Sequence, residues 1–324
     1  MPPILEKLAS VARKIPRIIF IYRHSQILQN LAADRRYNYY KNLSQDKYPQ
    51  ELKKWFKSAT GKLLNLENPK TFDEKIQWMK LYDSTPLKTQ LADKYLVRNY
   101  VTEKIGDEYL IPLLGVWDSF DEIDFDSLPK QFVLKANHGS GWNIIVRDKS
   151  KFDKEDAKKK FEKWMKTNYA YTPGLELHYK DIQPKIIAEE YIENGGGNLY
   201  DYKVHCFGGK AKYIQYIGDR ATHTTREVWF DTGWNLMSFT DGCYPKYDSD
   251  IPKPHNLQEL LSLSENLALS FSYVRVDFYV LNDGTFKFGE MTFTPASGVH
   301  NWFSDSEMTP DEVDLMLGRL IPAP

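Results

Sequence analysis

The sequence predicts an α+β protein in which antiparallel strands and amphipathic helices occupy separate stretches of the chain. Strand-like runs of β-branched and aromatic residues flank tight-turn dipeptides at Gly208-Gly209 and Asp283-Gly284, which is typical of β-hairpins. Apolar residues recur at helical spacing in residues 153–168 and 257–270. With 324 residues, 42% of them hydrophobic and 14% aromatic, the chain can bury a sizeable core in two or three lobes.

Composition excludes several classes of protein. No stretch approaches the roughly 18 to 20 apolar residues of a membrane-spanning helix. Arg13, Lys14 and Arg17 interrupt the N-terminal apolar residues, unlike in a signal peptide. The two cysteines, Cys206 and Cys243, have no CxxC spacing and so indicate neither a zinc site nor a disulfide framework. We therefore expect a cytosolic protein.

Charge is distributed unevenly along the chain. The net charge is −1, but residues 1–62 carry 13 Lys and Arg against 4 Asp and Glu. A basic segment suits an anionic partner such as a membrane surface or an acidic glycan. A solvated helical face would have the same composition, and we do not expect nucleic acid as a partner.

The first third of the chain is predicted to be helical. Apolar residues recur at helical spacing, and the expected helices lie in residues 1–45 (two helices), 49–61, 68–81 and 91–106. The clearest start is Thr71, because Glu74 three residues later completes a capping box. The two helices in residues 1–45 could lie on a membrane surface.

The rest of the chain alternates strands with turns and two more helices. We expect strands at 132–136, 143–146 and 185–194, an extended segment at 109–120 broken by Pro112, helices at 153–168 and 257–270, and hairpins at both tight turns. Residues 218–255 carry no readable pattern.

The hairpin in residues 274–298 carries the clearest chemical signal. If Asp283-Gly284 forms a two-residue type I′ turn, the opposed pairs are Tyr279 with Phe288, Asp277 with Glu290, and Arg275 with Thr292. Like charges directly opposite one another are destabilising unless something neutralises them. Mg²⁺ is a hard cation that takes carboxylate and phosphate oxygens. The hairpin therefore predicts a Mg²⁺ site at Asp277 and Glu290, with Arg275 within reach of a phosphate.

The same two acids have a plainer interpretation. They could lie on a solvated face, each paired with a Lys or Arg. The aromatic residues Tyr279 and Phe288, which we expect on the same face, favour a half-enclosed pocket instead.

The loop KANHGSGWN, residues 135–143, is a second candidate site. Its small residues Gly139, Ser140 and Gly141 would let backbone N–H groups approach phosphate oxygens, and Lys135 supplies a charge. It matches neither a Walker loop nor a Rossmann fingerprint, because a strand follows it. An ordinary hairpin turn is the alternative. Together with the metal hairpin, the loop predicts a nucleotide site between two sheets.

Taken together, these segments resemble the ATP-grasp superfamily. The blocks that carry the resemblance are Asp93-Lys94, FVLKANHGSGWN, IIAEEYIE, YDYKVHCFGGK, VRVDFY and FGEMTFTPASG. Over residues 45–324 the chain is similar to the teichuronopeptide-biosynthesis branch of that superfamily. The resemblance implies two α+β lobes that grip ATP between antiparallel sheets. The implied boundaries are a helical extension at 1–65 and an ATP-grasp region at 66–324, with lobes at about 128–190 and 191–324.

The resemblance also implies roles for single residues, with ATP and Mg²⁺ as cofactors. The residues that match phosphate contacts are Lys94, Lys135, His138, Gly139, Ser140 and Gly141. Those that match the adenine segment are Glu189, Glu190, Tyr191 and Ile192, and Asp201 falls where an acid, more usually Glu, holds the ribose. Lys203, Arg220 and Arg275 match the basic residues at the transferred phosphate, and Asp277, Glu290 and Thr292 match the metal ligands. Many members carry Asn where this chain has Thr292, whose hydroxyl is a poorer ligand than an amide oxygen.

Such a protein is expected to be an ATP-dependent carboxylate–amine ligase that forms an amide through an acyl phosphate. The branch implies a cell-surface polysaccharide of the capsule, O-antigen or teichuronopeptide type, in which a uronic acid carboxyl is joined to an amino acid or peptide amine. Residues 1–62 would then contact a lipid-linked glycan at the inner membrane face. The acceptor site could be lined by His205, His223, His300 and Arg226, although a structural role is the favoured interpretation of each histidine.

Two other functions fit parts of the sequence. A metal-dependent glycosyltransferase needs an Asp-x-Asp pair at a strand end, and Asp124/Asp126 and Asp248/Asp250 have that spacing. The first pair lies in an acidic segment before Pro129, and the second lies in a loop flanked by prolines. A nucleotide-binding scaffold without turnover is the third option, suggested by Thr292.

Overall fold

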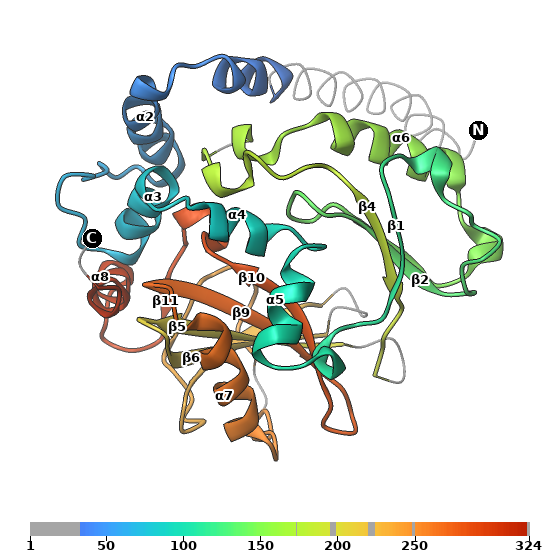
Figure 1. Ribbon diagram of the computed structural model, residues 1–324. Helices are drawn as coiled ribbons and strands as arrows, with labels where there is room; N and C mark the ends of the chain where they lie inside the picture. The colour runs from blue at the N-terminus through green and yellow to red at the C-terminus, as the bar shows by residue number, and fades with distance from the viewer. Residues whose placement is uncertain (1–32, 173, 195–198, 220–223, 248–249, 323–324) are drawn as a thin grey trace, which may run out of the picture.

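A computed structural model of the chain describes residues 33–172, 174–194, 199–219, 224–247 and 250–322. It contains two large antiparallel sheets surrounded by helices (Figure 1), so the predicted α+β class is confirmed. The two helices expected in residues 1–45 lie largely outside the described residues, of which only 33–41 form a helix there. None of the described helices is long and apolar enough to cross a membrane.

The smaller sheet has four strands in the order β1–β4–β2–β3, and every neighbouring pair is antiparallel. Its strands are β1 (Leu113–Trp117), β2 (Phe132–Ala136), β3 (Asn143–Val146) and β4 (Ile186–Glu190). Helix α6 (Lys154–Lys166) buries Phe161 in one core with Phe132 and Leu134 of β2. The predicted strands at 132–136 and 143–146 are confirmed.

The larger sheet has five strands in the order β10–β9–β5–β6–β7. Its strands are β5 (Tyr200–Phe207), β6 (Lys210–Gly218), β7 (Arg226–Asp231), β9 (Tyr273–Val280) and β10 (Phe286–Thr292). Helix α7 (Leu257–Ala268) covers one face, where Leu260 packs with Val204 and Val276. Because side chains alternate along a strand, Lys203, Arg275 and Asp277 are left for the opposite face.

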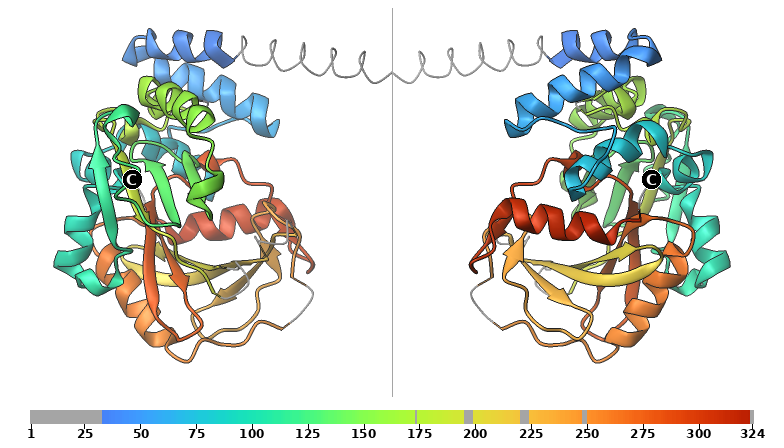
Figure 2. Two further views of the ribbon diagram at one scale, coloured as in Figure 1. Left: turned by 90° about the vertical axis from the view of Figure 1, so that its right-hand side faces the viewer. Right: turned by 90° about the vertical axis from the view of Figure 1, so that its left-hand side faces the viewer.

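Three helices form a layer around this second face: α2 (Tyr48–Thr60), α3 (Phe72–Tyr82) and α8 (Pro310–Leu320). Helix α2 ends at Gly61, where φ is 75°, and α3 begins at the predicted capping box of Thr71 and Glu74. Helix α3 packs on α8 in a core that also holds Trp229 and Trp302. Figure 2 shows α2 and the 33–41 helix stacked at one end of the molecule and the five-stranded sheet towards the other. A short sheet of β8 (Phe239–Thr240) and β11 (Phe303–Ser304) completes this side.

The single helix predicted at 91–106 is wrong. The chain forms α4 (Pro86–Ala92) and α5 (Val97–Lys104) instead. Between them, the Asp93 carboxylate accepts hydrogen bonds from the backbone N–H groups of Tyr95 (2.8 Å) and Leu96 (3.2 Å). Such side-chain bonds compete with the helical pattern and start a new turn. The break lets the Lys94 N–H bond to the Asn137 carbonyl at 3.1 Å, beside the predicted phosphate loop.

The two predicted hairpins differ in outcome. The turn at Gly208-Gly209 is confirmed, with φ of 55° and 74°. The type I′ turn at Asp283-Gly284 is wrong, because Gly284 has a φ of 84° while Asp283 has no positive φ. Backbone bonds close the turn between Leu281 and Thr285, which makes the loop one residue longer than predicted.

The longer loop shifts the register of the β9–β10 hairpin near its turn. Tyr279 therefore opposes Lys287 rather than Phe288, contrary to the prediction. A β-bulge between Phe288 and Glu290 then restores the register further along. The predicted opposition of Asp277 with Glu290 and of Arg275 with Thr292 is confirmed, because the turn and the bulge compensate one another.

Several elements were not predicted. Strand β7 and the β8–β11 pair lie where the sequence shows no alternation, and they form through tertiary pairing. Helix α8 carries a local signal, since Thr309 and Glu312 form a capping box before Pro310. The division into an extension and two lobes stays a prediction.

Candidate active site

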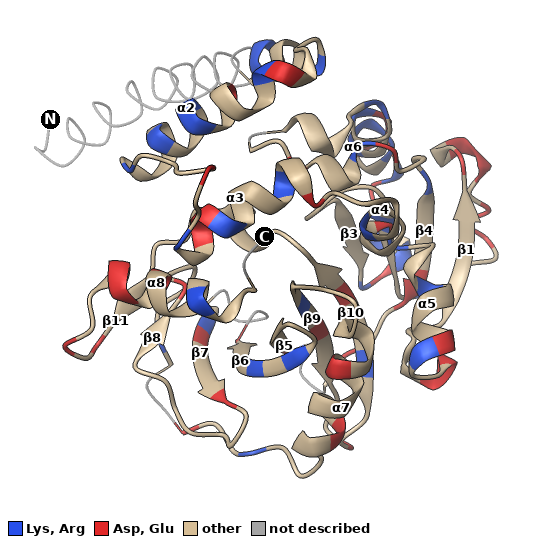
Figure 3. Ribbon diagram, turned by 60° about the vertical axis from the view of Figure 1, so that its left-hand side comes forward, with Lys and Arg blue, Asp and Glu red and all other residues tan. Residues whose placement is uncertain are grey.

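A cavity of about 490 Å³ lies between the two sheets. Its lining includes twelve of the predicted site residues: Lys94, Lys135, Ser140, Gly141, Glu189, Glu190, Tyr191, Ile192, Asp201, Lys203, Asp277 and Glu290. Residues separated by almost 200 positions in the sequence are thus brought to one place. Figure 3 shows charged residues of β5, β9 and β10 where these strands lie side by side.

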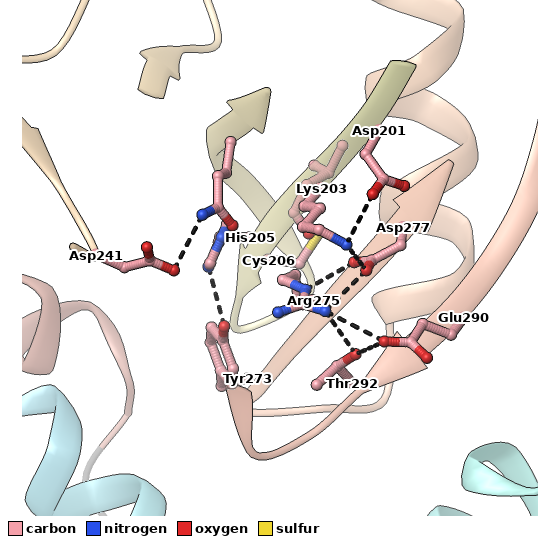
Figure 4. A network of polar contacts seen from close by, with 12 residues as sticks. Asp201, Lys203, His205, Cys206, Asp241, Tyr273, Arg275, Asp277, Glu290 and Thr292 are labelled. Carbon is pink, nitrogen blue, oxygen red and sulfur yellow. Dashed lines mark hydrogen bonds and ion pairs between the residues drawn. The ribbon is translucent and has the colours of Figure 1, made fainter. Parts of the chain in front are cut away.

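The hairpin side of the cavity is a network of opposite charges. The Arg275 guanidinium donates to both carboxylate oxygens of Asp277, at 2.7 Å and 2.8 Å, and to Glu290 Oε1 at 3.2 Å (Figure 4). Lys203 Nζ donates to Oδ2 of Asp277, an oxygen that Arg275 also contacts, and lies 3.7 Å from Asp201 Oδ2. The pairing with basic residues that the plainer interpretation expected is therefore present. The solvated face is not, because Asp277 is buried.

Both carboxyl groups of the hairpin are held in the ionised form. Burial would raise the pKa of Asp277, but the charges of Arg275 and Lys203 outweigh burial and lower it. For Glu290, burial and the neighbouring Asp277 also raise the pKa, and Lys94, Arg275 and Lys203 bring it below its usual value. At neutral pH, two adjacent carboxylate anions surrounded by cations are thus available to bind a metal ion.

These two carboxylates fit a Mg²⁺ ion that completes its shell with phosphate oxygens. The Glu290 side chain is 36% exposed and Asp277 only 3%, so Glu290 is the more accessible ligand. Within the described part of the chain, no three His, Cys, Asp or Glu residues are close enough to hold a metal by themselves. Mg²⁺ sites with one or two protein carboxylates and substrate phosphates have this composition.

Thr292 lies in the same network but its hydroxyl is engaged. Oγ1 accepts a hydrogen bond from Arg275 at 3.0 Å and donates one to Glu290 Oε1 at 2.8 Å. These two hydrogen bonds hold the charged side chains of Arg275 and Glu290 in place. Thr292 would have to give up these bonds to act as a third metal ligand.

The loop side of the cavity is built around Lys94. Its Nζ donates to the carbonyl of Gly139 at 2.6 Å, and burial lowers its pKa. Lys135 pairs with Glu189, which Arg98 also contacts at 3.2 Å. Gly141 has a φ of 72° and lines the cavity with Ser140.

His138, by contrast, is directed into the fold. Its ring nitrogens contact Asn137 Oδ1 at 3.1 Å and the Trp164 carbonyl at 3.0 Å, and it does not line the cavity. Gly139 is also absent from the lining. The structure therefore brings two of the four predicted loop residues to the cavity.

The cavity lining also includes apolar side chains. Sequence analysis did not single out Ile111, Val133, Ile145 and Leu199, nor Arg147, but it did expect Tyr279 to border a pocket. Alternation along the predicted strands 132–136 and 143–146 could have identified Val133 and Ile145. A cavity lined by both cations and apolar side chains suits a ligand with a polyanionic part and a flat ring, as in a nucleoside triphosphate.

None of the described residues predicted for the acceptor site lines the cavity. His205 is buried, its Nδ1 is 3.0 Å from the Tyr273 hydroxyl, and burial and Arg275 lower its pKa. The His300 side chain is buried and its Nδ1 pairs with Asp73 at 2.5 Å, and it stacks on Trp302. These contacts match the structural interpretation of both histidines. Arg226 donates to the Lys246 carbonyl at 3.5 Å, and Arg220 and His223 lie outside the described residues.

The polar face continues beyond Arg275 to His205 and Asp241 (Figure 4). We call this row the polar strip, and its members are Glu290, Asp277, Arg275, His205, Gln215, Asp241 and Glu227. At its far end Gln215 Nε2 donates to Asp241 Oδ2 (2.9 Å) and to Glu227 Oε2 (2.7 Å). Burial and the adjacent Asp241 raise the pKa of Glu227 to about 8. At neutral pH Glu227 therefore retains its proton, unlike the acids at the cavity.

Of the two Asp-x-Asp pairs, the structure fully describes only Asp124 and Asp126. Asp124 Oδ1 accepts a hydrogen bond from the Asp126 N–H at 3.1 Å, which makes a local turn on the surface. Asp248 lies outside the described residues. Neither observation supports a glycosyltransferase.

Comparison with protein families gives one match, to the model described as "TupA-like ATPgrasp", over residues 74–322. No significant match was found among curated proteins. Among solved structures, an L-amino acid ligase from Bacillus licheniformis is similar at 14% identity and a TM-score of 0.43, covering 74% of this chain and 51% of that one. A D-alanine–D-alanine ligase from Bacillus anthracis complexed with ATP has 17% identity and a TM-score of 0.39, covering 71% and 64%.

A third similar structure is N5-carboxyaminoimidazole synthetase from Staphylococcus aureus complexed with ADP. It has 11% identity and a TM-score of 0.41, covering 72% of this chain and 53% of that one. The chain thus spans about half to two thirds of the length of these structures. Because every TM-score is below 0.5, we base family membership on the family match alone.

Proposed function

The chain belongs to the TupA-like ATP-grasp family, and from that premise we propose that it joins an amine to a carboxylate at the cost of ATP. Membership confirms the predicted ATP-grasp fold. We propose that the protein is an ATP-dependent ligase with ATP and Mg²⁺ as its cofactors. We propose the substrates from the resemblance described above: a uronic acid carboxyl of a cell-surface polysaccharide and an amino acid or peptide amine.

One observation carries the proposal: three lysines and the two ionised carboxylates of the hairpin line one cavity, whose lining also includes apolar side chains. Lys94, Lys135 and Lys203 would hold the phosphates, and Asp277 and Glu290 would hold Mg²⁺. When bound, the ion would offset negative charge on the phosphate oxygens. The apolar walls near Tyr191 and Ile192 would hold adenine, and Asp201 would hold the ribose.

The reaction then needs positioning rather than a protein nucleophile. The substrate carboxylate attacks the terminal phosphorus, which gives an acyl phosphate and ADP. The amine attacks the acyl carbon and phosphate leaves. Arg275 and Lys203 face the phosphate that is transferred, and their charges stabilise it as it migrates. Arg220 is proposed for the same task from the resemblance.

The basic segment supports the proposed location of the substrate. Of residues 1–62, the structure describes 33–62, where Lys53, Lys54 and Lys57 lie on α2. We propose that this segment contacts a lipid-linked acidic glycan at the inner membrane face. A salt-sensitive association with anionic vesicles would support this contact.

The test is an ADP-release assay with Mg²⁺ and ATP, a panel of uronates and a panel of amino acids. Release that requires both a uronate and an amine supports the ligase. Release of UDP from UDP-sugars without ATP consumption would support the glycosyltransferase instead. Binding of ATP without turnover across the panels would support a scaffold.

A further inference from the structure

A segment outside the predicted site lies beside the phosphate loop. It contains the short helices η5 (Tyr169–Tyr171) and η6 (Leu177–Tyr179), which connect α6 with β4 beside α3 and α4 (Figure 1). Tyr169 lies against Ser140 of the phosphate loop and packs on Tyr179 at 4.8 Å between ring centres. Besides burial, the negative charges of Glu176 and Glu290 help to raise the pKa of both tyrosines. This segment therefore lies near Glu290, at the proposed metal site.

Glu176 is the acid of this segment, and it has no role in the function proposed so far. It is 8% exposed and accepts a hydrogen bond from the hydroxyl of Thr294, two residues beyond Thr292 on the same chain segment. Burial raises its pKa, and the nearby charge of Glu290 adds to the rise. A carboxylate without an assigned task thus lies within electrostatic range of Glu290, one of the proposed metal ligands.

Lys80 of α3, in the helical layer, offsets the negative charge of Glu176. Its Nζ donates to Ser297 Oγ at 2.8 Å, and the same hydroxyl bonds to Glu176. Lys80 is fully buried and lies 4.6 Å from the centre of the Trp55 ring on α2. Burial lowers its pKa to about 7, and the charge of Glu176 opposes that shift.

The backbone at Ser297 is strained, and the same lysine holds it. Ala296 and Ser297 have φ of 46° and 52°, a region that side chains other than glycine rarely occupy. Lys80 and Gln77 both donate to the Ser297 carbonyl. Strain that surrounding contacts enforce is frequent at functional sites. Here it fixes the hydroxyl between Lys80 and Glu176.

From this arrangement we propose that Glu176 is a catalytic residue that accepts the proton of the incoming amine, with Ser297 and Lys80 as its positioning residues. The inference rests on the proposed ligase function. The amine reaches the protein as an ammonium ion and has no lone pair until one proton leaves. A carboxylate beside the acyl phosphate can take that proton.

The balance of the step is as follows. The ammonium gives one proton to the Glu176 carboxylate, and the freed lone pair forms the C–N bond. The bond between the acyl carbon and the phosphate oxygen breaks, and phosphate leaves with that electron pair. The second proton of the nitrogen goes to the departing phosphate, and Glu176 returns its proton to solvent.

Hydroxylamine separates this role from a structural one. It is uncharged at neutral pH and attacks acyl phosphates without losing a proton first, whereas the ammonium group of an amino acid must be deprotonated. The experiment compares wild type with Glu176→Gln in two assays: hydroxamate formation from D-glucuronate or D-galacturonate, and amide formation from the same uronates with glycine. Glu162→Gln, on the exposed face of α6, is the matched control.

We expect Glu176→Gln to lower the amide rate by on the order of 10²-fold while hydroxamate formation and nucleotide affinity change little. Equal loss in both assays, or no loss in either, overturns the inference and leaves the ligase function intact. Failure of the wild type to form hydroxamate from any uronate rejects the proposed function and with it the role of Glu176. The retained hydroxamate activity also shows that the variant is folded.

Discussion

The polar strip carries an acidic pair at each end, and the two pairs are in opposite states. At the cavity, Asp277 and Glu290 are ionised because Arg275, Lys203 and Lys94 outweigh their burial. At the far end, Glu227 and Asp241 have only the neutral Gln215 amide between them, and the pKa of Glu227 rises to about 8. Two buried acid pairs on one face thus differ through their neighbours: one can receive a cation, and the other retains a proton.

The largest expected effect comes from neutralising the ionised pair. Glu290→Gln keeps the shape of the side chain but removes the charge that would hold Mg²⁺, and we expect a fall in kcat of at least about 10²-fold. Circular dichroism and the melting temperature should stay close to wild type, because Glu290 is half-exposed. An enzyme that keeps full activity would remove the metal assignment and the contrast between the two pairs.

The second acid pair, Glu227 and Asp241, is expected to affect stability rather than activity. The pKa of Glu227 is about 8 in the folded protein against a usual 4.5. Between these values the folded protein binds a proton that the unfolded chain has lost, so stability is greatest below pH 4.5 for this group and falls as pH rises to about 8. The slope contributed by one group is at most about 1.4 kcal/mol per pH unit.

Glu227→Gln should flatten this dependence, because Gln mimics the protonated acid. Urea unfolding from pH 5 to pH 9 should show that the unfolding free energy of the variant increases relative to that of wild type as pH rises. Turnover at neutral pH should be unchanged. Parallel pH profiles for the two proteins would show that Glu227 is ionised like the pair at the cavity.

The smallest expected effect sharpens the role of Thr292. Its hydroxyl bonds to Arg275 and Glu290, so Thr292→Val should cost about 1 kcal/mol of unfolding free energy and leave the Mg²⁺ dependence of ADP release unchanged. A large increase in the Mg²⁺ concentration needed for half-maximal rate would instead make Thr292 a metal ligand.

The gathering of the hairpin and loop residues at one cavity was predictable because their signals are local. Asp277, Glu290 and Arg275 lie on one hairpin, and Lys135, Ser140 and Gly141 lie on one strand and loop. Their opposition in the structure nevertheless depends on a turn and a bulge that the sequence analysis missed, which compensate one another. Gly289 is the only sequence trace of the bulge, since a side chain there would approach the Asp277 carbonyl at 3.1 Å.

The group of Glu176, Ser297 and Lys80 was not predictable, because no short segment contains all three residues. Glu176 lies in a loop, Ser297 in a strained turn and Lys80 in a helix. Pattern analysis assigns no chemical role to any of these segments. The break at Asp93 that positions Lys94 was missed because helical periodicity in 91–106 concealed a local side-chain cap. Tertiary contacts, rather than propensity, set these features.

The most direct test of the account is a crystal structure with Mg²⁺ and a non-hydrolysable ATP analogue. We predict a metal ion bound to carboxylate oxygens of both Asp277 and Glu290 and to phosphate oxygens, with adenine between Val133, Ile145 and Tyr279. A triphosphate bound elsewhere, or Asp277 and Glu290 still held only by Arg275 and Lys203 with nucleotide present, would contradict it.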